Sequence, residues 1–443
     1  MVSDADGLDQ RVDELIESWK ALSPKEYEEH FLALDKITAQ EFFLCLSSTD
    51  QAHVFTFLPP KFRTSLAKLL PLDDLVDLLQ ELSPEEKNEL ITSLDNWTKT
   101  EVNALLAYKE DVAGGLMNSR YARLRADMTV EEALKYLRAQ TQANLETIYY
   151  AYVIDSNQIL VGALTLRELF TAKGNESINN IMTMRPNLIT IPENIEQEEM
   201  AKIFAETEHL ALPVVDDSGK MKGVITIDDV VDVLEEEATE DFQKIGGMEA
   251  LEEPYLKVHF FEMFKKRAGW LVVLFAGETL TASAMTHFED QIAKAVLLAL
   301  FIPLIISSGG NSGSQASTLI VRALALDEVR LKDWWRVFVR ETFSGLLLGL
   351  FLGIIGIMRV FFWPNKESLY GHHYGLVSLT VGVSLIGVVM LGTLTGSMLP
   401  FILKRFKLDP AVASAPFVAT IVDVTGLVIY FSAAKLFLSG ILL

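Results

Sequence analysis

The charged and the apolar residues of this chain lie in different halves of the sequence. Residues 1–262 contain 23 Lys and Arg against 50 Asp and Glu, whereas residues 263–443 contain 15 against 10. Half of all residues are nevertheless apolar, and the second half holds repeated apolar runs long enough to cross a bilayer. These facts predict an acidic soluble part of two or three domains, followed by a membrane part.

Neither a cleaved signal nor a disulfide framework is expected. The first thirty residues are polar and acidic and lack a basic region followed by an apolar one, so the first membrane span must direct targeting. Cys45 is the single cysteine, which excludes an intrachain disulfide or a cysteine metal site. The sequence has no nucleotide-hydrolysis loop, no HExxH and no nucleophile–base arrangement, so we do not expect an enzyme.

A leucine recurs every twelve residues through the first hundred positions. Each is followed by Ser, Asp or Pro, which are residue types that start helices. Ser23-Pro24-Lys25-Glu26 and Ser83-Pro84-Glu85-Glu86 both have the pattern of a capping box. We predict an α-helical, acidic N-terminal domain at residues 1–110, in which short helices stack as a superhelix; an ordinary helical bundle is the alternative. The repeated residues are Leu22, Leu34, Leu46, Leu58, Leu70, Leu82 and Leu94.

Residues 111–238 change to short β-rich runs that alternate with amphipathic helices, and this α/β region repeats itself. The first copy contains Tyr152-Val-Ile-Asp and Val161-Gly-Ala-Leu-Thr-Leu-Arg-Glu. About sixty residues later, the second contains Leu212-Pro-Val-Val-Asp and Lys222-Gly-Val-Ile-Thr-Ile-Asp-Asp. The copies resemble a tandem CBS pair, a ligand-sensing module, with CBS 1 at residues 111–175 and CBS 2 at residues 176–238.

The CBS resemblance implies a nucleotide site. In such pairs a Thr and an Asp three residues later often hold the phosphate and ribose of an adenosyl nucleotide. Thr226 and Asp229 match this pattern, whereas the first copy departs from it with Thr165 and Glu168. The same residues fit a helix N-cap, so both interpretations stay open.

A dense run of carboxylates follows the second copy, with eight Asp and Glu between Asp228 and Asp241. Positions 229, 232, 236 and 240 share one face of a helix, where like charges repel unless a cation lies between them. A solvated face is the alternative. The strongly acidic soluble half favours hard divalent cations with oxygen ligands.

Five membrane spans are predicted, at about 269–286, 294–322, 337–361, 376–403 and 411–438, in an all-α transmembrane domain at residues 268–443. Lys and Arg gather before the first span, between the second and third, and between the fourth and fifth. By the positive-inside rule, this multi-pass protein has a cytoplasmic N-terminus and a C-terminus outside.

Ionisable residues inside the spans are costly and therefore candidates for function. Asp423 lies twelve residues into the predicted last span, roughly 18 Å along a helix and close to the midplane. An ion site, a structural Asp and a proton relay are the three interpretations. The small polar run Ser307–Gln315 either lines a water-filled path or serves helix packing alone. Glu341 is a candidate for an inner vestibule, and Glu278 in the first span has no assigned role.

The order of these parts resembles the MgtE magnesium channel family across essentially the whole chain. The similar stretches are Asp111-Val-Ala-Gly-Gly-Leu-Met, Glu237-Ala-Thr-Glu-Asp241, Gly309-Gly-Asn-Ser-Gly-Ser-Gln315, Asp409-Pro-Ala and Pro416-Phe-Val-Ala-Thr-Ile-Val-Asp423-Val-Thr-Gly. The resemblance implies a homodimer in the bacterial inner membrane, with a pore on its two-fold axis. It also implies a linking helix at residues 239–267 that plugs the pore.

The resemblance further implies ligands. Two copies of Asp423 would hold a hydrated Mg²⁺, with the carbonyl of Ala419 and Asn311 at the same site, since Mg²⁺ dehydrates reluctantly. Ala415 departs from members with a polar side chain before the proline. Cytosolic Mg²⁺ would close the pore by bridging carboxylates, which requires tighter binding to the closed state. The implied regulatory set is Glu196, Glu198, Glu208, Asp229, Asp232, Glu237, Glu240 and Asp241. The positions that match an ATP site are Tyr150, Arg167, Glu168 and Thr226.

Two other functions remain open at this stage. One is a CBS-regulated secondary transporter, coupled to protons or sodium, with Asp423 as its ion site. The other is a membrane sensor that transports nothing. Oxygen ligands do not rank Mg²⁺ above Mn²⁺, Co²⁺, Ni²⁺ or Ca²⁺. Membrane lipid is an expected partner, and nucleic acid is not.

Overall fold

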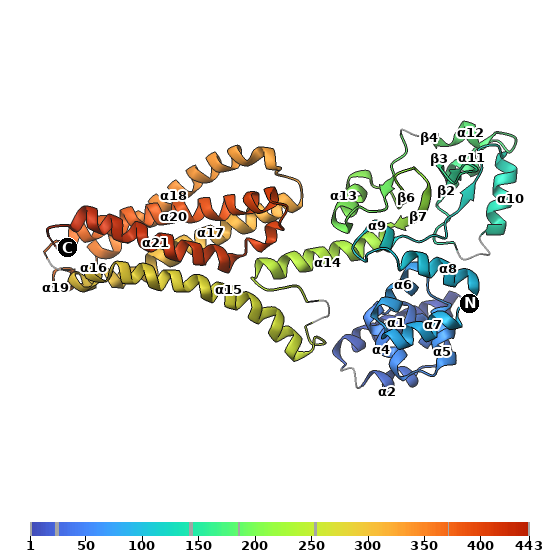
Figure 1. Cartoon of the computed structure of the whole chain (residues 1–443), viewed down its shortest axis with the longest axis horizontal. Helices are drawn as coiled ribbons and strands as arrows, with labels where there is room; N and C mark the ends of the chain where they lie inside the picture. Colours follow the sequence, from blue (N-terminus) through green and yellow to red (C-terminus); the bar gives the residue numbers. More distant parts are fainter. Residues whose placement is uncertain are drawn as a thin grey trace. The chain divides into compact units, whose positions relative to one another are not determined.

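The chain divides into two compact units, Met1–Glu237 and Ala238–Leu443. The computed structural model (Figure 1) describes residues 2–22, 26–140, 145–184, 187–251, 255–370 and 372–441. The first unit contains short helices and two small sheets, and the second contains five long apolar helices.

The N-terminal helices follow the twelve-residue period of the sequence. Helices α3 to α8 begin at residues 36, 48, 60, 72, 84 and 96. The period predicted from leucine spacing is therefore the period of the helices. The helices are α1 (Val2–Ala21), α2 (Tyr27–Leu32), α3 (Lys36–Leu44), α4 (Ser48–Phe57), α5 (Pro60–Ala67), α6 (Leu72–Glu81), α7 (Pro84–Ser93) and α8 (Asn96–Leu105).

Side-chain caps and buried leucines explain where these helices start. Asp35 and Asp95 each accept hydrogen bonds from two backbone N–H groups of the first turn that follows. Ser83 accepts from the Glu86 N–H and so caps α7, while its hydroxyl donates to the Glu86 carboxylate, in place of the backbone N–H bond of the predicted capping box. The equivalent at Ser23 lies outside the described residues. The leucines at 46, 58, 70, 82 and 94 are all buried, so the prediction of a helical N-terminal domain is confirmed.

Two small mixed sheets form the CBS pair. In each, a parallel pair of strands is followed by an antiparallel hairpin with an irregularity next to its turn. The predicted internal repeat is thus present as a repeated topology. The first sheet has the order β1 (Arg123–Leu124), β2 (Tyr150–Ile154), β3 (Leu160–Thr165), β4 (Thr183–Met184), and the second β5 (Ile191–Pro192), β6 (Ala211–Val215), β7 (Met221–Thr226). The helices of this region are α9 (Ala113–Leu116), α10 (Val130–Gln140), α11 (Leu166–Thr171), α12 (Ile178–Ile181) and α13 (Gln197–Thr207).

The Asp111–Met117 stretch joins the helical domain to CBS 2. The N–H groups of Ala113 and Gly114 donate to carbonyls at positions 195 and 193. A Cβ on Gly114 would overlap the Tyr108 ring, and one on Gly115 would overlap the Lys109 carbonyl oxygen. Both glycines are therefore required by close backbone approach.

Helix α14 (Ile227–Ile245) starts directly after β7, and α15 (Phe260–His287) is a separate helix. The predicted linking helix is therefore present as α14, but it starts at Ile227 and ends at Ile245 instead of extending over residues 239–267. Gly247 ends α14 with a φ of +77°, and a Cβ there would lie 2.8 Å from Trp270 Nε1 and 3.1 Å from Pro416 Cγ. This left-handed, tightly packed position accepts only glycine.

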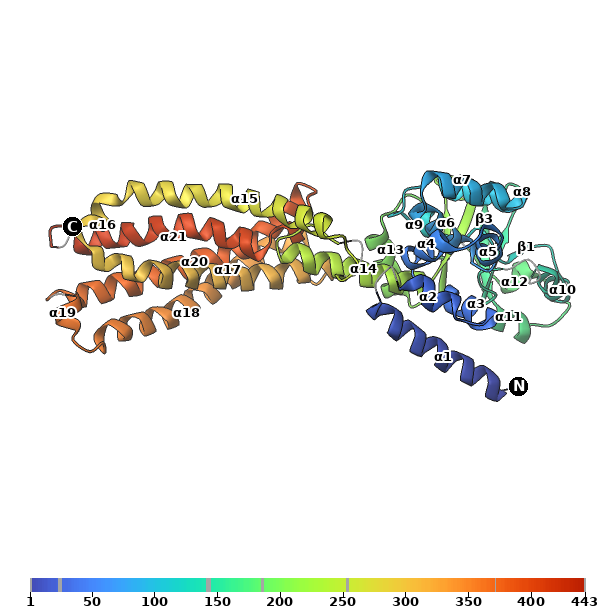
Figure 2. The same cartoon turned by 90° about the horizontal axis from the view of Figure 1, so that it is seen from below.

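Five helices of the second unit are long and apolar enough to span a membrane, as predicted. Figure 2 shows them side by side. The first, fourth and fifth are α15, α20 (Tyr374–Arg405) and α21 (Ala415–Leu438). The second, Val296–Ala325, consists of the 3₁₀ helix η2 (Val296–Phe301) and α17 (Ile302–Ala325). The third, Leu331–Phe361, consists of the 3₁₀ helix η3 (Leu331–Asp333) and α18 (Trp334–Phe361). The short helices are α16 (Glu289–Lys294), α19 (Lys366–Tyr370) and η4 (Pro410–Val412).

The last span begins later than predicted. A 3₁₀ turn occupies residues 410–412, and Ser414 caps α21 by accepting from the Phe417 N–H. Asp423 consequently lies eight residues into the helix, about 12 Å from its start, rather than near its midpoint.

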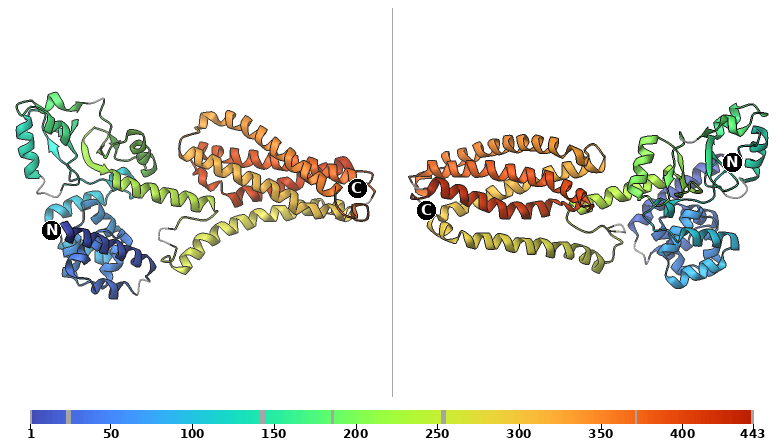
Figure 3. Two further views of the ribbon diagram at one scale, coloured as in Figure 1. Left: turned by 180° about the vertical axis from the view of Figure 1, so that it is seen from behind. Right: turned by 45° about the horizontal axis from the view of Figure 1, so that its top comes forward.

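Helix α20 is the centre of the membrane unit and packs against α17, α18 and α21 (Figure 3). A Cβ on Gly392 would overlap the carbonyl oxygen of Gly309, and one on Gly396 that of Gly313. Small residues thus let the backbones of α17 and α20 touch. The packing interpretation of the Gly-Ser run is correct for its buried glycines.

Candidate cation and nucleotide sites

A cluster of carboxylates lies where α6 of the helical domain approaches the start of α14. Asp229 and Asp232, predicted from sequence, belong to it. Asp73, Asp74 and Asp77 of α6 and Glu146 also belong to it, and the sequence analysis missed all four. Asn118 bridges two of these groups, since its Nδ2 donates to Asp73 Oδ1 at 3.1 Å and to Glu146 Oε2 at 2.7 Å.

Burial and mutual repulsion disfavour the charged forms of these carboxyls. Burial, with the charges of Glu146 and Asp229, raises the pKa of Asp73 well above its usual value. Burial and neighbouring carboxylates raise the pKa of Asp77 to about 7 and that of Glu146 to about 7. Burial raises the pKa of Asp229 to about 6, although hydrogen bonds from Thr226 oppose the shift. The cluster therefore favours any cation that can neutralise it.

The remaining predicted regulatory carboxylates are placed differently. Glu198 pairs with Lys202 at 2.8 Å, Glu237 accepts from Gln197 Nε2 at 2.8 Å, and Glu240 pairs with Lys244 at 2.5 Å. The exposed Glu196 and Glu208 flank the two ends of α13, and Asp241 is half-buried on α14. Within the described parts of the chain, no three His, Cys, Asp or Glu are arranged to hold a metal ion as they stand. The regulatory ligand set stays a prediction.

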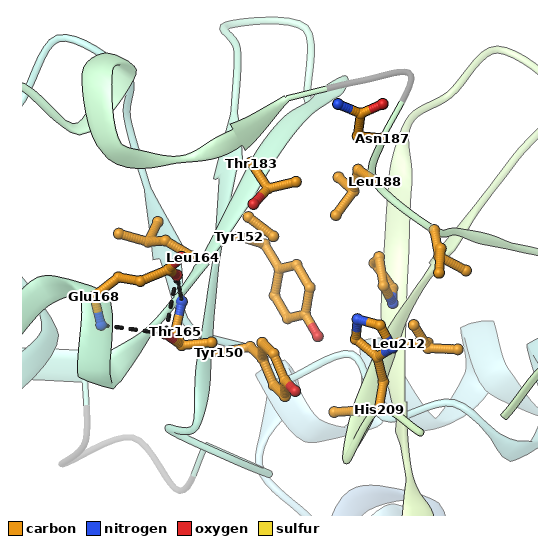
Figure 4. Close-up of a pocket in the computed structure, with 14 residues that line it drawn as sticks. Tyr150, Tyr152, Leu164, Thr165, Glu168, Thr183, Asn187, Leu188, His209 and Leu212 are labelled. Carbon is orange, nitrogen blue, oxygen red and sulfur yellow. Dashed lines mark hydrogen bonds between the residues drawn. The ribbon is translucent and has the colours of Figure 1, made fainter. Parts of the chain in front are cut away.

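A pocket of about 130 Å³ lies between the two CBS copies (Figure 4). The rings of Tyr150 and His209 face it, with centroids 6.3 Å apart. Tyr152 is 1% exposed, and its hydroxyl points into the pocket without a hydrogen-bond partner among the described residues. A buried orphan hydroxyl of this kind calls for a polar ligand atom. The volume is below the roughly 300 Å³ of typical ligand sites, so it suits an aromatic base alone.

Both Thr–carboxylate pairs act as helix caps. The N–H and Oγ1 of Thr165 donate to Glu168 Oε2 at 2.6 and 2.9 Å. The same groups of Thr226 donate to Asp229 Oδ2 at 3.2 and 2.8 Å. Of the residues predicted to hold ATP, Tyr150 and Glu168 line the pocket, whereas Arg167 on α11 is not among its lining residues.

An exposed polar stripe runs along α17 in the membrane unit. Ser307, Asn311, Gln315 and Thr318 are all exposed and recur at helical spacing on one face. Exposed polar side chains on a spanning helix need water or protein rather than lipid around them. The spacing of these four polar residues by three or four positions is visible in the sequence and could have predicted this stripe.

The stripe lies beside the start of α21. Gly310 packs against Ala419, and a Cβ added to Gly310 would lie 3.5 Å from the Ala419 Cβ. Ser314 donates to the Ala415 carbonyl at 3.2 Å, and Ser317 donates to the Ala413 carbonyl at 2.6 Å. These bonds hold the first turn of α21 against α17, and so bring Asn311 and Ala419 to neighbouring positions.

Asp423 lies one turn beyond Ala419 and is half-buried. Its carboxyl lies close to that of Glu278 of α15, a residue to which no role was assigned from sequence. The hydroxyls of Thr420 and Thr425 turn back to carbonyls of α21 itself. Among the described residues, no hydrogen bond or ion pair links Glu341 to this region, and its helix α18 packs on α20.

The end of α14 is tied to the turn before α21. Lys244 Nζ lies 2.7 Å from Asp409 Oδ2 and 2.5 Å from Glu240 Oε1. Burial alone would lower the pKa of Lys244, but its bonds to Asp409 and Glu240 raise it. Asp409 also caps the 3₁₀ turn by accepting from the Ala411 N–H at 2.8 Å. One ammonium thus connects the carboxylate-rich helix to the segment that leads into α21.

Comparisons with known proteins agree with this arrangement. Residues 10–111 match the MgtE intracellular N domain, residues 111–175 and 178–236 match the CBS domain, and residues 302–433 match the divalent cation transporter family MgtE. The magnesium transporter MgtE of Thermus thermophilus is 40% identical over 431 residues, which cover 97% of this chain and 93% of that protein. The chain belongs to the MgtE family of magnesium transporters. The MgtE of Bacillus subtilis is 30% identical over 432 residues, covering 89% of this chain and 93% of that protein.

Membership in the MgtE family confirms several predictions. The chain is a membrane protein with five candidate spans and an intracellular N domain, and it is a transporter rather than an enzyme. A solved structure of the cytosolic domain of the Mg²⁺ channel MgtE in complex with ATP is 37% identical, covers 50% of this chain and 90% of that chain, and has a TM-score of 0.47.

The carboxylate cluster predicts how pH acts on the cytosolic unit. Carboxyls with a raised folded pKa stabilise the fold at low pH, and that stabilisation is lost as pH rises through the folded pKa. Without Mg²⁺, protection of α6 and α14 should therefore fall as pH rises through about 6 for Asp229 and about 7 for Asp77 and Glu146. Added Mg²⁺ should offset the loss. Hydrogen exchange in the full-length protein, corrected for intrinsic rates, measures this.

Matched variants test the assignment to the cluster. Asp77→Asn should flatten the pH dependence and weaken the Mg²⁺ effect. Asp217→Asn changes an exposed carboxyl in the β6–β7 turn and should alter neither. Protection that stays constant between about pH 5 and 8 without Mg²⁺ would contradict the prediction.

Proposed function

We propose that the chain is a passive, Mg²⁺-selective channel whose opening is controlled by cytosolic Mg²⁺. The observation that carries the proposal is the exposed polar stripe of α17 beside Ala419 and Asp423. A row of amide and hydroxyl groups next to a carboxylate suits an ion that keeps its water shell, as Mg²⁺ does. The carbonyl of Ala419 lies within α21, where helical bonding leaves one lone pair for such water.

The pore is proposed to lie between two copies of the chain. The stripe is exposed on the surface of a single five-helix unit, where lipid cannot satisfy it. A two-fold partner would place two stripes and two Asp423 carboxylates around one water-filled path. Ala415 supplies no side-chain ligand, and its carbonyl already accepts from Ser314. Asp423 is therefore the proposed ion site, with Asn311 contributing from α17.

The proposed membrane is the bacterial inner membrane, with the N-terminus cytoplasmic and the C-terminus outside. The Lys and Arg distribution supports this orientation. The membrane potential then drives divalent cations inward by about 4.6 kcal/mol per 100 mV. No nucleotide-hydrolysis machinery is required for such flux.

Gating is proposed to use the carboxylates of α6 and α14. Mg²⁺ bound there would hold the helical domain and α14 together, and its loss would let their like charges repel. The end of α14 carries Lys244, and its partner Asp409 directly precedes the 3₁₀ turn that leads into α21. The closed state must bind Mg²⁺ more tightly than the open one for this coupling to work.

A nucleotide is proposed as a second regulatory ligand. The orphan Tyr152 hydroxyl and the Tyr150 and His209 rings support an aromatic base in the pocket between the CBS copies. ATP is the proposed nucleotide, with its phosphates outside the small cavity.

Flux measurements test the channel. Full-length protein in liposomes should pass Mg²⁺ rapidly, and flux should fall as Mg²⁺ rises on the side of the cytosolic unit. Asp423→Ala should abolish flux or make it unselective, whereas Asp290→Asn, an exposed carboxyl on α16, should not. Flux that needs a proton or sodium gradient would instead indicate a secondary transporter, and absence of flux would indicate a sensor.

The ion pair at the end of α14 gives a gating prediction. Lys244→Met leaves the Glu240 and Asp409 carboxylates facing each other, so the closed state should need more Mg²⁺. A partly exposed pair contributes about 1 kcal/mol, which corresponds to roughly a fivefold rise in the Mg²⁺ for half-closure. Flux at graded cytosolic Mg²⁺ measures it. Lys202→Met, which breaks only the pair with Glu198, is the control, and an unchanged Lys244→Met response would contradict the role.

Calorimetric titration of the full-length protein with ATP, ADP and adenosine tests the nucleotide site. Loss of base stacking, worth about 1–3 kcal/mol, should weaken binding at least about fivefold in Tyr150→Ala. Tyr136→Ala changes an exposed tyrosine on α10 and should leave affinity unchanged. Equal ATP affinity in wild type and Tyr150→Ala would refute the assignment.

A further inference from the structure

Glu278 is an intramembrane carboxyl that the proposed pore ligands do not include. It lies near the middle of α15, which packs beside α21 (Figure 2). The preceding residue, Gly277, fits against α21 so closely that a Cβ there would lie 2.7 Å from Thr420 Cγ2. This contact brings the Glu278 carboxyl beside the Asp423 carboxyl, close enough for the two to share a hydrogen bond when one of them is protonated.

The pair has no basic partner along its own two helices. The nearest Lys or Arg in sequence are Arg267 on α15 and Lys435 on α21, which lie eleven and twelve residues away, roughly 17–18 Å along a helix. Among the described groups, none of opposite charge acts on Asp423. Two carboxyls in a membrane unit without a basic partner are costly unless they share a proton or a cation joins them.

A second polar group lies on the same side of α15. Thr281 is one turn beyond Glu278, and its hydroxyl is buried without a hydrogen-bond partner in the described structure. A buried hydroxyl without a partner is suited to hold a water molecule. Glu278 and Thr281 therefore place one carboxyl and one hydroxyl a single turn apart on α15.

We infer that Glu278 is a specificity-determining residue of the ion path, which pairs with Asp423 of the same chain to favour a hydrated divalent cation over a monovalent one. Two carboxylates match the charge of one divalent ion, whereas a single positive charge leaves one of them uncompensated. The water shell of the ion would reach the Thr281 hydroxyl. This inference rests on the proposed channel function. It adds a residue of α15 to an ion path whose other proposed ligands come from α17 and α21.

A purely structural role gives different expectations. If the Glu278–Asp423 hydrogen bond only fastens α15 to α21, an amide of the same shape should replace the carboxyl without changing ion preference. If Glu278 supplies charge, the amide should change ion preference even when packing is intact. Glu278→Gln separates these cases, because glutamine keeps the length and hydrogen bonding and removes the charge.

The test compares Mg²⁺ and Na⁺ flux through full-length protein in liposomes. Glu278→Gln should raise the Mg²⁺ concentration for half-maximal flux about tenfold and admit Na⁺, because half of the negative charge is gone. Glu278→Asp keeps the charge but moves it away from the ion, because the side chain is shorter. The Mg²⁺ concentration for half-maximal flux should therefore rise a few-fold while Na⁺ stays excluded. Glu289→Gln on α16, an exposed carboxyl outside the spans, is the matched control.

Each outcome bears on one claim. Wild-type flux that is lost in Asp423→Ala but has the same half-saturation and Na⁺ exclusion in Glu278→Gln would overturn the role of Glu278 and leave the channel standing. Absence of flux in the wild type would overturn the channel itself. If Glu278→Gln does not fold, as judged by gel filtration and thermal unfolding, a wild-type half-saturation in Glu278→Asp would still overturn the inference.

Discussion

Repulsion between carboxylates for which the described residues supply no basic partner is the constraint on which much of this structure depends. In the cytosolic unit, α6 and α14 bring acidic residues together until several of their pKa values rise toward neutrality. In the membrane unit, Glu278 and Asp423 meet between α15 and α21. Folding has placed negative charge where water is scarce, and this is stable only with protons or cations present. A magnesium transporter has such a cation at hand.

The local features of the fold could be predicted because their causes are local. A cap residue and a leucine every twelve positions specify where each helix starts, and the helices begin on that period. Apolar length specified five spans. The linking helix was predicted to continue to residue 267, but Gly247 ends α14 by packing between Trp270 and Pro416. That packing joins residues far apart in sequence.

The candidate sites could be predicted only in part, because a site depends on residues that the fold brings together. Asp229 and Asp232 were visible within a charge run, whereas Asp73 and Glu146 looked like ordinary surface acids. Asp229 lies more than eighty residues from either of them in sequence, and Asn118, which links both, carries no motif. Asp423 stood out because it interrupts an apolar span, and Glu278 did so equally. Neither sequence position indicated that the two carboxyls are in contact.

The contacts of α14 and α21 suggest why the sensor and the ion path occur in one chain. Helix α14 begins with the carboxylates of the cytosolic cluster and ends with Lys244 bonded to Asp409. Asp409 caps the turn before α21, Ser314 and Ser317 fasten the start of α21 to α17, and Asp423 follows two turns later. A shift of α14 would therefore act on the short, hydrogen-bonded entrance of α21 rather than on its apolar length. Coupling through a few polar bonds needs only a small free-energy difference between states, which suits a gate set by the binding of one small ion.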